Sequence, residues 1–357
     1  MQDKDWNVIT TKIKQQKCVL LLGPEVVVAD TNGTFQSQLK SYLEKQHIEN
    51  LIYYSEDEFF SFQDFNQEQD VYMAISEFYN QMGMPKVYNL LTEIPFYIII
   101  SLSPDLILKK AFEEKGIDII FDFYYKKRNP QDLARPSMET PIVYNLLGSI
   151  QEEDSLVFTY ESLFDYLIKI FGTHHLPDTL RKNLQEAQNF IFLGFKYERW
   201  YLKLLLRLLG LGINERKRIH SSKPEIEIRP TTQQYYSEEL KVNFVDDNVA
   251  DFVVKLHAKC QEEDLIRVPG EVSLREQLKA EVKSLLGESR LQDAINRIAA
   301  YVKANAKELI NDFSVLTSRY FKLKTDMDLG LLEDKDAALD MRRIVKDFLE
   351  FTDRLFA

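Results

Sequence analysis

The chain of 357 residues has a formal net charge of −11, with 45% hydrophobic and 28% charged residues. This composition is typical of a folded globular protein and argues against a disordered one, and the length predicts two or three domains. An acidic surface repels phosphate backbones and anionic lipids, so we expect neither a nucleic-acid partner nor a membrane partner.

No apolar run reaches the ~18 residues of a membrane span, and the first residues lack the apolar core of a signal peptide. The two cysteines, Cys18 and Cys260, form neither a disulfide framework nor a zinc-ligand spacing. We therefore expect a soluble protein of the reducing cytoplasm, without a metal site.

Short apolar runs alternate with helical stretches up to residue 262. Most of these runs are apolar throughout, which is typical of a sheet covered on both faces, so the sequence predicts a three-layer α/β fold. The helix predicted over 104–115 has a marked start, because Ser103 can cap it and Pro104 suits its first turn. The predicted strands are 18–23, 96–102, 117–123, 141–148, 155–160, 189–195, 225–230 and 241–247. The other predicted helices are 3–15, 35–46, 66–82, 161–171, 177–187, 197–211 and 248–262.

Residues 270–357 follow another pattern, without proline or any strand-like run. Apolar side chains recur there at helical spacing in four stripes, which predicts an all-α bundle of four or five helices. Basic and acidic residues number 16 each from residue 265 onward, so all the net charge lies before it. The predicted organisation is an α/β domain over 1–263, a linker over 264–270 and a helical domain over 271–357.

Ligands of doubly wound sheets bind beyond the carboxyl ends of the strands, where helix N-termini offer free N–H groups. Three predicted strand ends are candidates: "LLLGPEV", "IIISLSPD" and "YNLLGSI". Followed by "FIFLGFKYERWYLKLLLRLL", they resemble the sirtuin-like, NAD-binding fold, particularly the branch found in bacterial conflict and immune proteins. The resemblance spans about residues 5–260 and implies a Rossmann-type sheet.

The first strand of that family ends in a Gly-Ala-Gly turn that holds the pyrophosphate. Here Gly23 matches, whereas Pro24 and Glu25 replace the other two residues. The change to Glu25 matters most, because it brings a carboxylate to the place where two phosphates would lie, and like charges repel.

The family's other signatures are also altered. Thr-Asn-Tyr-Asp reads Leu-Ser-Pro-Asp here, which keeps Asp105 but replaces the asparagine that handles the ribose with Ser103. His-Gly, whose imidazole is the base, reads Leu-Gly at 147–148, and a leucine cannot transfer protons. Gly194 is matched, and Glu198 stands near the usual aspartate.

The resemblance implies NAD or ADP-ribose as the candidate ligand, and two interpretations of each feature stay open. The turn at Gly23 is either a ligand turn or an ordinary strand-to-helix turn. Catalysis is either lost or carried by Asp105, Ser103 or Glu198 in an NAD glycohydrolase. Deacetylation is not expected, because the histidine base and the usual cysteine zinc module are missing. The residues implied to contact the cofactor are Gly23, Pro24, Glu25, Ser103, Asp105, Gly148 and Gly194.

The helical end resembles the small effector-associated domains of bacterial and cyanobacterial conflict systems. Such modules occur on a sensor and on its effector and bind like to like, which implies a homotypic partner, on another protein or a second copy, and a homo-oligomer. Opposite charges on one neutral bundle favour such contacts, although they are equally typical of solvated helix faces. The candidate contacts are Arg319, Lys322 and Lys324 against Asp326, Asp328, Glu333 and Asp336. The matched positions are Leu316, Ser318, Arg319, Tyr320, Leu323, Leu329, Gly330, Leu331, Ala337, Arg342, Arg343, Ile344 and Leu349.

Together these features predict a prokaryotic conflict-system or immune protein, active in antiphage defence. Its sirtuin-like domain has lost catalysis and serves as a scaffold or nucleotide sensor, recruited through the homotypic helical domain. The alternative is an NAD glycohydrolase effector that depletes NAD once it is recruited.

Overall fold

The computed structural model forms two compact units, Met1–Pro269 and Gly270–Ala357, which are described separately. The domains predicted from the sequence, 1–263 and 271–357 with a linker over 264–270, stay a prediction about which segments fold independently. The structure describes residues 3–29, 33–46, 48, 51–63, 65–129, 131–172, 175–211, 217–267, 274–287, 290–305, 309–331 and 334–355.

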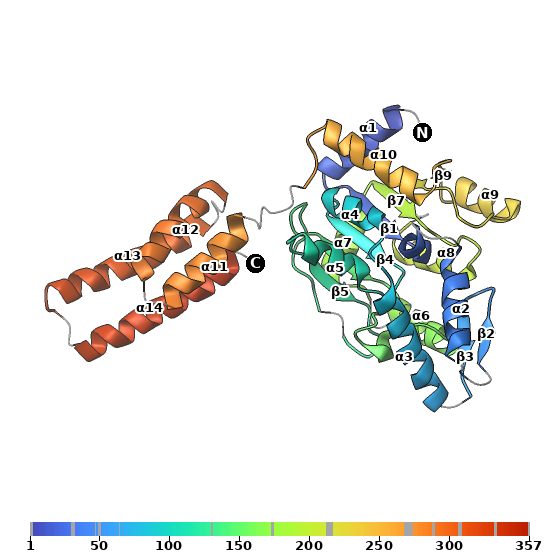
Figure 1. The fold of residues 1–357 in the computed structure, drawn as a ribbon. Coiled ribbons are helices and arrows are strands. Elements are labelled where there is room, and N and C mark those ends of the chain that lie inside the picture. Colours follow the sequence, from blue (N-terminus) through green and yellow to red (C-terminus); the bar gives the residue numbers. More distant parts are fainter. Residues whose placement is uncertain are drawn as a thin grey trace. The chain divides into compact units, whose positions relative to one another are not determined.

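The first unit is built on a seven-stranded sheet in the order β5-β6-β4-β1-β7-β8-β9, with helices on both sides (Figure 1). All neighbouring strands pair in parallel. The α/β fold class predicted from the apolar runs is therefore confirmed. The strands are β1 (Cys18–Leu22), β4 (Ile98–Ser101), β5 (Ile120–Phe123), β6 (Ile142–Asn145), β7 (Asn189–Leu193), β8 (Arg218–Ser221) and β9 (Val242–Phe244).

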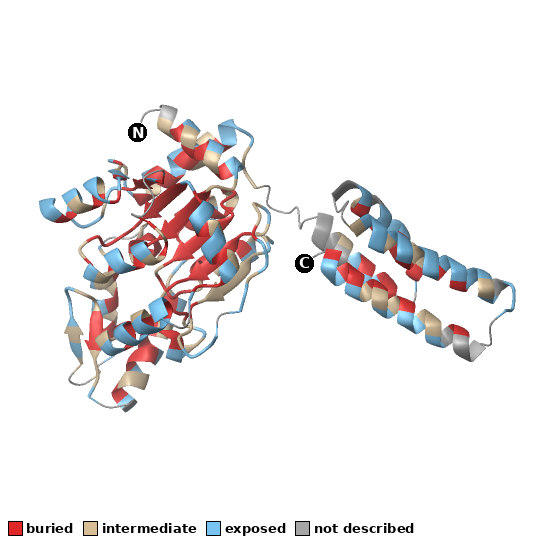
Figure 2. Ribbon diagram, turned by 180° about the vertical axis from the view of Figure 1, so that it is seen from behind, coloured by how far each residue is buried: buried red, intermediate tan, exposed pale blue. Residues whose placement is uncertain are grey.

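The central strands are buried along their whole length (Figure 2). Alternate residues of these strands enter two separate apolar cores, one on each face of the sheet. Leu20 of β1, for example, packs on one face and Leu21 on the other. One face is covered by α1 (Asp3–Lys14), α2 (Phe35–Lys45), α3 (Phe65–Gln81), α4 (Lys86–Glu93), α5 (Ile107–Glu114) and α10 (Val249–Glu262), and the other by α6 (Tyr160–Gly172), α7 (Asp178–Glu186), α8 (Trp200–Leu208) and α9 (Pro230–Glu238).

The order in which the chain adds strands to the sheet reverses between β1 and β7. These strands are neighbours, yet the helix α2 that follows β1 packs on one face and the helix α8 that follows β7 packs on the other. Such a switch point opens a crevice at the carboxyl ends of the two strands, where doubly wound folds place their ligands.

Two predicted strands are wrong. The run 155–160 forms no strand: η2 (Glu153–Ser155) precedes a coil whose apolar residues fill the core as a loop. The run 225–230 is largely exposed coil, and the strand that lies between β7 and β9 comes earlier in the sequence, at β8. An antiparallel hairpin of β2 (Ile52–Tyr54) and β3 (Phe59–Ser61) was not predicted from the sequence.

The second unit contains the helices α11 (Leu274–Gly287), α12 (Leu291–Asn305), α13 (Ile310–Asp328) and α14 (Asp334–Leu355). Their apolar stripes meet in one core that includes Val282, Ile298, Tyr320 and Phe348. The predicted all-α region is confirmed. Among the described residues of both units, no helix is long and apolar enough to cross a membrane.

Candidate ligand site at the edge of the sheet

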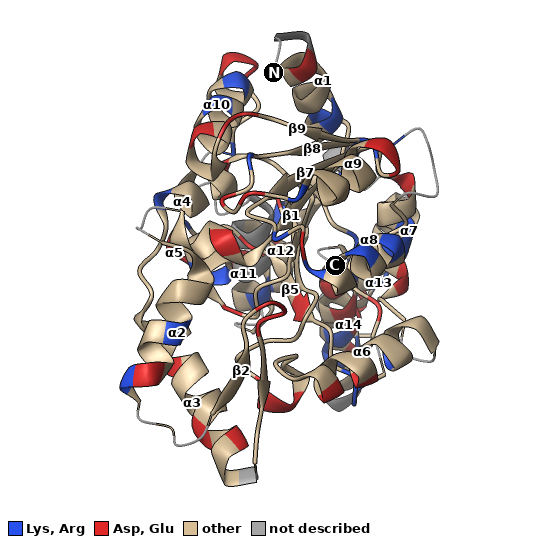
Figure 3. Ribbon diagram, turned by 90° about the vertical axis from the view of Figure 1, so that its right-hand side faces the viewer, with Lys and Arg blue, Asp and Glu red and all other residues tan. Residues whose placement is uncertain are grey.

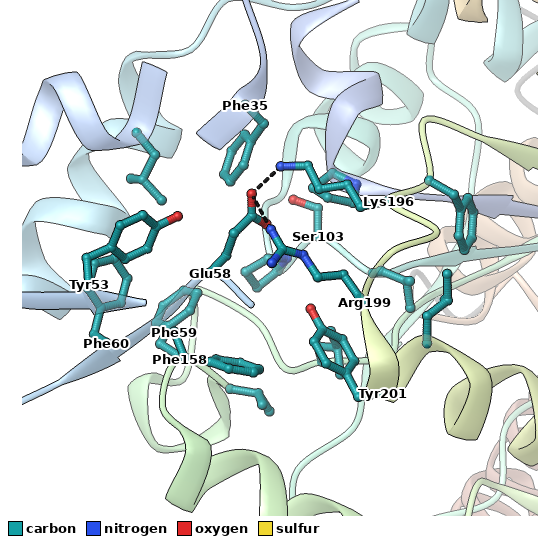
Figure 4. A pocket seen from close by; sticks show the side chains of 18 of the residues that line it. Phe35, Tyr53, Glu58, Phe59, Phe60, Ser103, Phe158, Lys196, Arg199 and Tyr201 are labelled. Carbon is teal, nitrogen blue, oxygen red and sulfur yellow. Dashed lines mark hydrogen bonds and ion pairs between the residues drawn. The ribbon is translucent and has the colours of Figure 1, made fainter. Parts of the chain in front are cut away.

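A cavity of about 90 Å³ lies beyond the carboxyl ends of the central strands (Figure 4). Pro24 after β1, Ser103 after β4, Leu147 after β6 and Lys196 after β7 line it. Of the residues expected to contact a cofactor, the cavity thus brings together Pro24 and Ser103. The rest of its wall is mainly aromatic and includes Phe35, Tyr53, Phe59, Phe60, Phe158 and Tyr201.

Gly23 and Gly194 close the crevice between β1 and β7 instead of lining it. The Gly23 N–H donates to the carbonyl of Leu193 (2.8 Å), and a Cβ on Gly23 would lie 2.2 Å from the Gly194 carbonyl oxygen. Gly194 has φ +66°, and a Cβ there would lie 2.6 Å from the amide nitrogen of Val26. Both glycines are needed because two backbone segments touch, which leaves them no surface for a ligand.

The side chain of Glu25 contacts the start of α2, which follows it in the chain. Its Oε2 accepts a hydrogen bond from the Phe35 N–H at 3.0 Å, the first residue of that helix. Its Oε1 lies 2.7 Å from Lys196 Nζ, and both side chains are almost fully buried. A helix N-terminus attracts anions through its free N–H groups and its dipole, and here the chain's own carboxylate takes that place.

Four charged side chains form a cluster in and beside the cavity. Lys196 contacts Glu58 as well as Glu25, and Arg199 Nη2 lies 2.9 Å from Glu58 Oε1. The two cations and two carboxylates balance. Nη1 of Arg199 has no hydrogen-bond partner among the described residues. Lys196 and Arg199 stand in the quoted segment after β7, so their strand-end position could have revealed them; Glu58 comes from the unpredicted hairpin.

Ser103 and Asp105 do different things from what the sequence predicted. The helix begins at Ile107 rather than 104, and Asp105 Oδ1, not Ser103, accepts its first N–H (2.8 Å). The Ser103 hydroxyl instead lies 3.3 Å from the Tyr79 hydroxyl. Burial raises the pKa of the Asp105 carboxyl, although its hydrogen bonds act against this. Asp105 does not line the cavity, and its side chain caps the start of α5.

Gly148 is held by the loop that follows β6. It has φ +91°, and a Cβ there would lie 2.2 Å from the Ser155 carbonyl oxygen. The Ser155 hydroxyl accepts from the Ser149 N–H at 2.9 Å, which fixes the same turn. Gly148 therefore packs against protein, and its neighbour Leu147 faces the cavity.

Glu198 binds the start of another helix. It accepts from the Arg229 N–H and Nε, both at 2.7 Å, and from the Thr232 hydroxyl at 3.0 Å, at the N-terminus of α9. Partial burial opposes ionisation, but these hydrogen bonds lower the pKa of Glu198 below its ordinary value. Of the three candidate catalytic groups, Ser103 lines the cavity, whereas Asp105 and Glu198 do not.

The cysteines are both buried free thiols. Burial raises the pKa of the Cys260 thiol to about 12 and raises that of Cys18 as well, so neither is a thiolate at neutral pH. Among the residues that the structure describes, no group of three or more His, Cys, Asp or Glu side chains could hold a metal ion.

The residues present do not fit a dinucleotide. The pyrophosphate would need the N-terminus of α2, where Glu25 lies, and a path past Gly23, which the backbone of Gly194 closes. The cavity of about 90 Å³ is also smaller than the ~300 Å³ at which small-molecule pockets begin.

Some of the candidate contact residues of the second unit lie on its surface. Lys322 and Lys324 are exposed, while Arg319 Nη1 pairs with Asp347 Oδ2 of α14 at 2.7 Å. Asp326 is partly exposed. The side chains of Asp328 and Asp336, and Glu333 as a whole, lie outside the described residues.

Comparison with family models agrees with these two folds. Residues 98–245 match the model of the SIR2-like domain, and residues 277–356 match that of effector-associated domain 11. The chain joins a SIR2-like domain to an effector-associated domain. Both resemblances inferred from the sequence motifs are thereby confirmed. No curated protein matched the chain.

Proposed function

We propose that this is a cytoplasmic protein of a prokaryotic conflict system whose SIR2-like domain no longer turns over NAD. The domain acts as a scaffold, and the effector-associated domain recruits it to a like domain. Domain pairing supports the first part, because a SIR2-like domain followed by an effector-associated domain is suggestive of conflict systems.

The single observation that carries the loss of turnover is the position of Glu25. Its carboxylate accepts from the N-terminus of α2 and is neutralised by Lys196, so it takes up the helix N-terminus that a phosphate would otherwise use. A bound dinucleotide would have to displace a buried ion pair, which costs several kcal/mol. Leu147 adds to this, because it faces the cavity where the family has its histidine base.

Incubation of the full chain with NAD tests this function. We expect no release of nicotinamide, either alone or with an oligomerising agent. Release that is abolished by Asp105→Ala but kept by Asp118→Ala, a matched change of an exposed aspartate, would establish the NAD glycohydrolase instead.

A nucleotide-sensing role has one observation in its favour. Nη1 of Arg199 is buried without a hydrogen-bond partner among the described residues, and aromatic rings surround the cavity. A guanidinium N–H and stacked rings suit a small planar ligand. Calorimetry of the full chain against NAD, ADP-ribose and ATP distinguishes the roles: heat that Arg199→Lys removes would favour the sensor, and silence with all three favours the scaffold.

The recruiting contact is tested on the full chain as well. We expect Lys322→Glu with Lys324→Glu to weaken self-association or adaptor binding, because both lysines are exposed on α13. Lys303→Glu, an equally exposed charge reversal on α12, is the control. Equal association of all three proteins would remove α13 from the contact.

A further inference from the structure

Two helices on one side of the SIR2-like unit expose large apolar side chains. On α6, Phe164, Ile168 and Phe171 are spaced by four and three residues and share one face. On α8, Trp200 and Leu204 are four residues apart. The exposed fractions are 51% for Phe164, 69% for Ile168, 46% for Phe171 and 39% each for Trp200 and Leu204.

These side chains form one surface, here called the α6–α8 patch. The rings of Phe164 and Trp200 lie 6.3 Å apart between centroids, so the two stripes meet. With about 200 Å² for each large side chain, the exposed parts amount to an area on the order of 500 Å². That is near the upper end of the largest apolar patch of a monomer, a size that is often functional.

Of the two helices, α6 carries acidic and basic residues, whereas α8 carries only basic ones (Figure 3). The α6 side carries exposed Glu161 and Asp165, with Lys169 one turn further on. The α8 side carries exposed Lys203 and Arg207 and no acidic residue. The exposed charges beside the patch are thus mainly acidic on α6 and basic on α8.

We propose that the α6–α8 patch is the interface of a symmetric dimer with a second copy of this chain. A two-fold axis through the contact of Phe164 with Trp200 places α6 of one copy against α8 of the other. The apolar stripes then cover each other, and Glu161 and Asp165 approach Lys203 and Arg207 of the second copy. An isologous interface requires this self-complementarity, because one surface serves both sides.

The size of the α6–α8 patch also fits an interface with a second copy of this chain. A stable interface buries about 800 Å² on each partner, with an apolar centre and a polar rim. The patch supplies the centre, including the aromatic side chains that dominate binding energies, and the flanking charges supply the rim. This interface is separate from the recruiting contact of the effector-associated domain and does not depend on it.

Sedimentation of the full chain over a range of concentrations tests the dimer. We expect Ile168→Asp to raise the dissociation constant at least about tenfold, because a buried carboxylate would face the apolar stripe. Met73→Asp is the matched control, since Met73 is 64% exposed on α3, away from the patch. An unchanged dissociation constant in a folded Ile168→Asp protein would overturn the proposed interface.

Cross-linking tests directly whether the α6–α8 patch is the interface, independently of any association through the effector-associated domain. Variants Ile168→Cys and Leu204→Cys are mixed and treated with a short bismaleimide; we expect covalent heterodimers joined between 168 and 204. The native cysteines are buried and give the background. Absence of this product, or a monomer whose patch is nevertheless protected from hydrogen exchange by the tail, contradicts the dimer.

Charge reversal gives an independent check of the two-fold arrangement. Glu161→Arg and Arg207→Glu each weaken the dimer when alone, because like charges then meet across the axis. Mixed together, they form a heterodimer in which both equivalent edges pair opposite charges, because one edge keeps the native pair and the other has its signs exchanged. No recovery on mixing would exclude the pairing of α6 with α8.

Discussion

The two units of the chain differ in where they place their charges. In the SIR2-like unit, Glu25, Lys196 and Arg199 have side chains that are at most 7% exposed, and they contact one another or Glu58. In the effector-associated unit, every ion pair among the described residues joins side chains that are at least 36% exposed.

Because of this difference, the ion pairs of the first unit are fixed, whereas those of the second unit can exchange partners. A buried pair cannot lose one partner without leaving a charge in a poorly solvated place, so the cluster beside the cavity has one stable geometry. An exposed pair gains little over water, so Arg319 can leave Asp347 for an acidic group of another protein at small cost. The charges of the buried cluster are thus fixed in one arrangement, whereas the surface charges of the second unit can form other pairs.

Matched glycine substitutions should give the largest contrast. We expect Gly194→Ala to lower the free energy of unfolding of the first unit by more than ~3 kcal/mol, because a Cβ would meet the Val26 backbone at 2.6 Å. Gly330 has a similar φ of +66° but open space around it, so Gly330→Ala should cost only ~1–2 kcal/mol in the second unit. Denaturant melts measure both, with Gly83→Ala as the neutral control, and equal losses would show that the crevice is not closed by backbone contact.

Removal of the buried cation comes next. Lys196→Met should destabilise the first unit by ~3–5 kcal/mol, because Glu25 and Glu58 are left as carboxylates without it. Adding Glu25→Gln should recover part of the loss, since the amide oxygen can still accept from Phe35. A double variant as unstable as the single one would mean that the loss comes from packing rather than charge.

Glu198 gives a smaller, pH-dependent effect. Glu198→Ala should cost ~1–2 kcal/mol at pH 7, as for other helix-start acceptors. The folded-state pKa of this carboxyl is lowered, so its stabilisation is present above the ordinary carboxyl pKa and is lost as the pH falls through the lowered value. Urea melts at pH 7 and at progressively lower pH should show the difference from wild type vanish, whereas Glu225→Ala, which changes an exposed residue, should show none at any pH.

The smallest change in stability is expected in the effector-associated unit. Arg319→Ala should change the stability of the second unit by no more than ~1 kcal/mol, because its pair with Asp347 is about half exposed. Binding of a like domain should nevertheless fall if Arg319 takes part in recruitment. A loss of several kcal/mol in a thermal melt would instead make this pair structural and erase the contrast with Lys196.

The sequence by itself determined the class of each unit. Apolar runs such as 18–23 and 189–195 can only be buried between two layers, so they predicted the covered parallel sheet, and the four apolar stripes after 270 predicted the bundle. The departures at Glu25 and Leu147 were also readable, because a residue's charge or lack of a proton donor does not depend on the fold.

Only the tertiary structure decided what those residues do. Glu25 reaches a helix that starts ten residues later, Gly23 meets Gly194 across the switch point, and Glu58 arrives from a hairpin that no local pattern indicated. The same holds for the predicted strand 155–160, whose apolar residues are buried in a loop. Periodicity reports whether a segment is buried, but which distant groups meet depends on strand order and on the faces chosen by the connections, and these arise only when the whole chain packs.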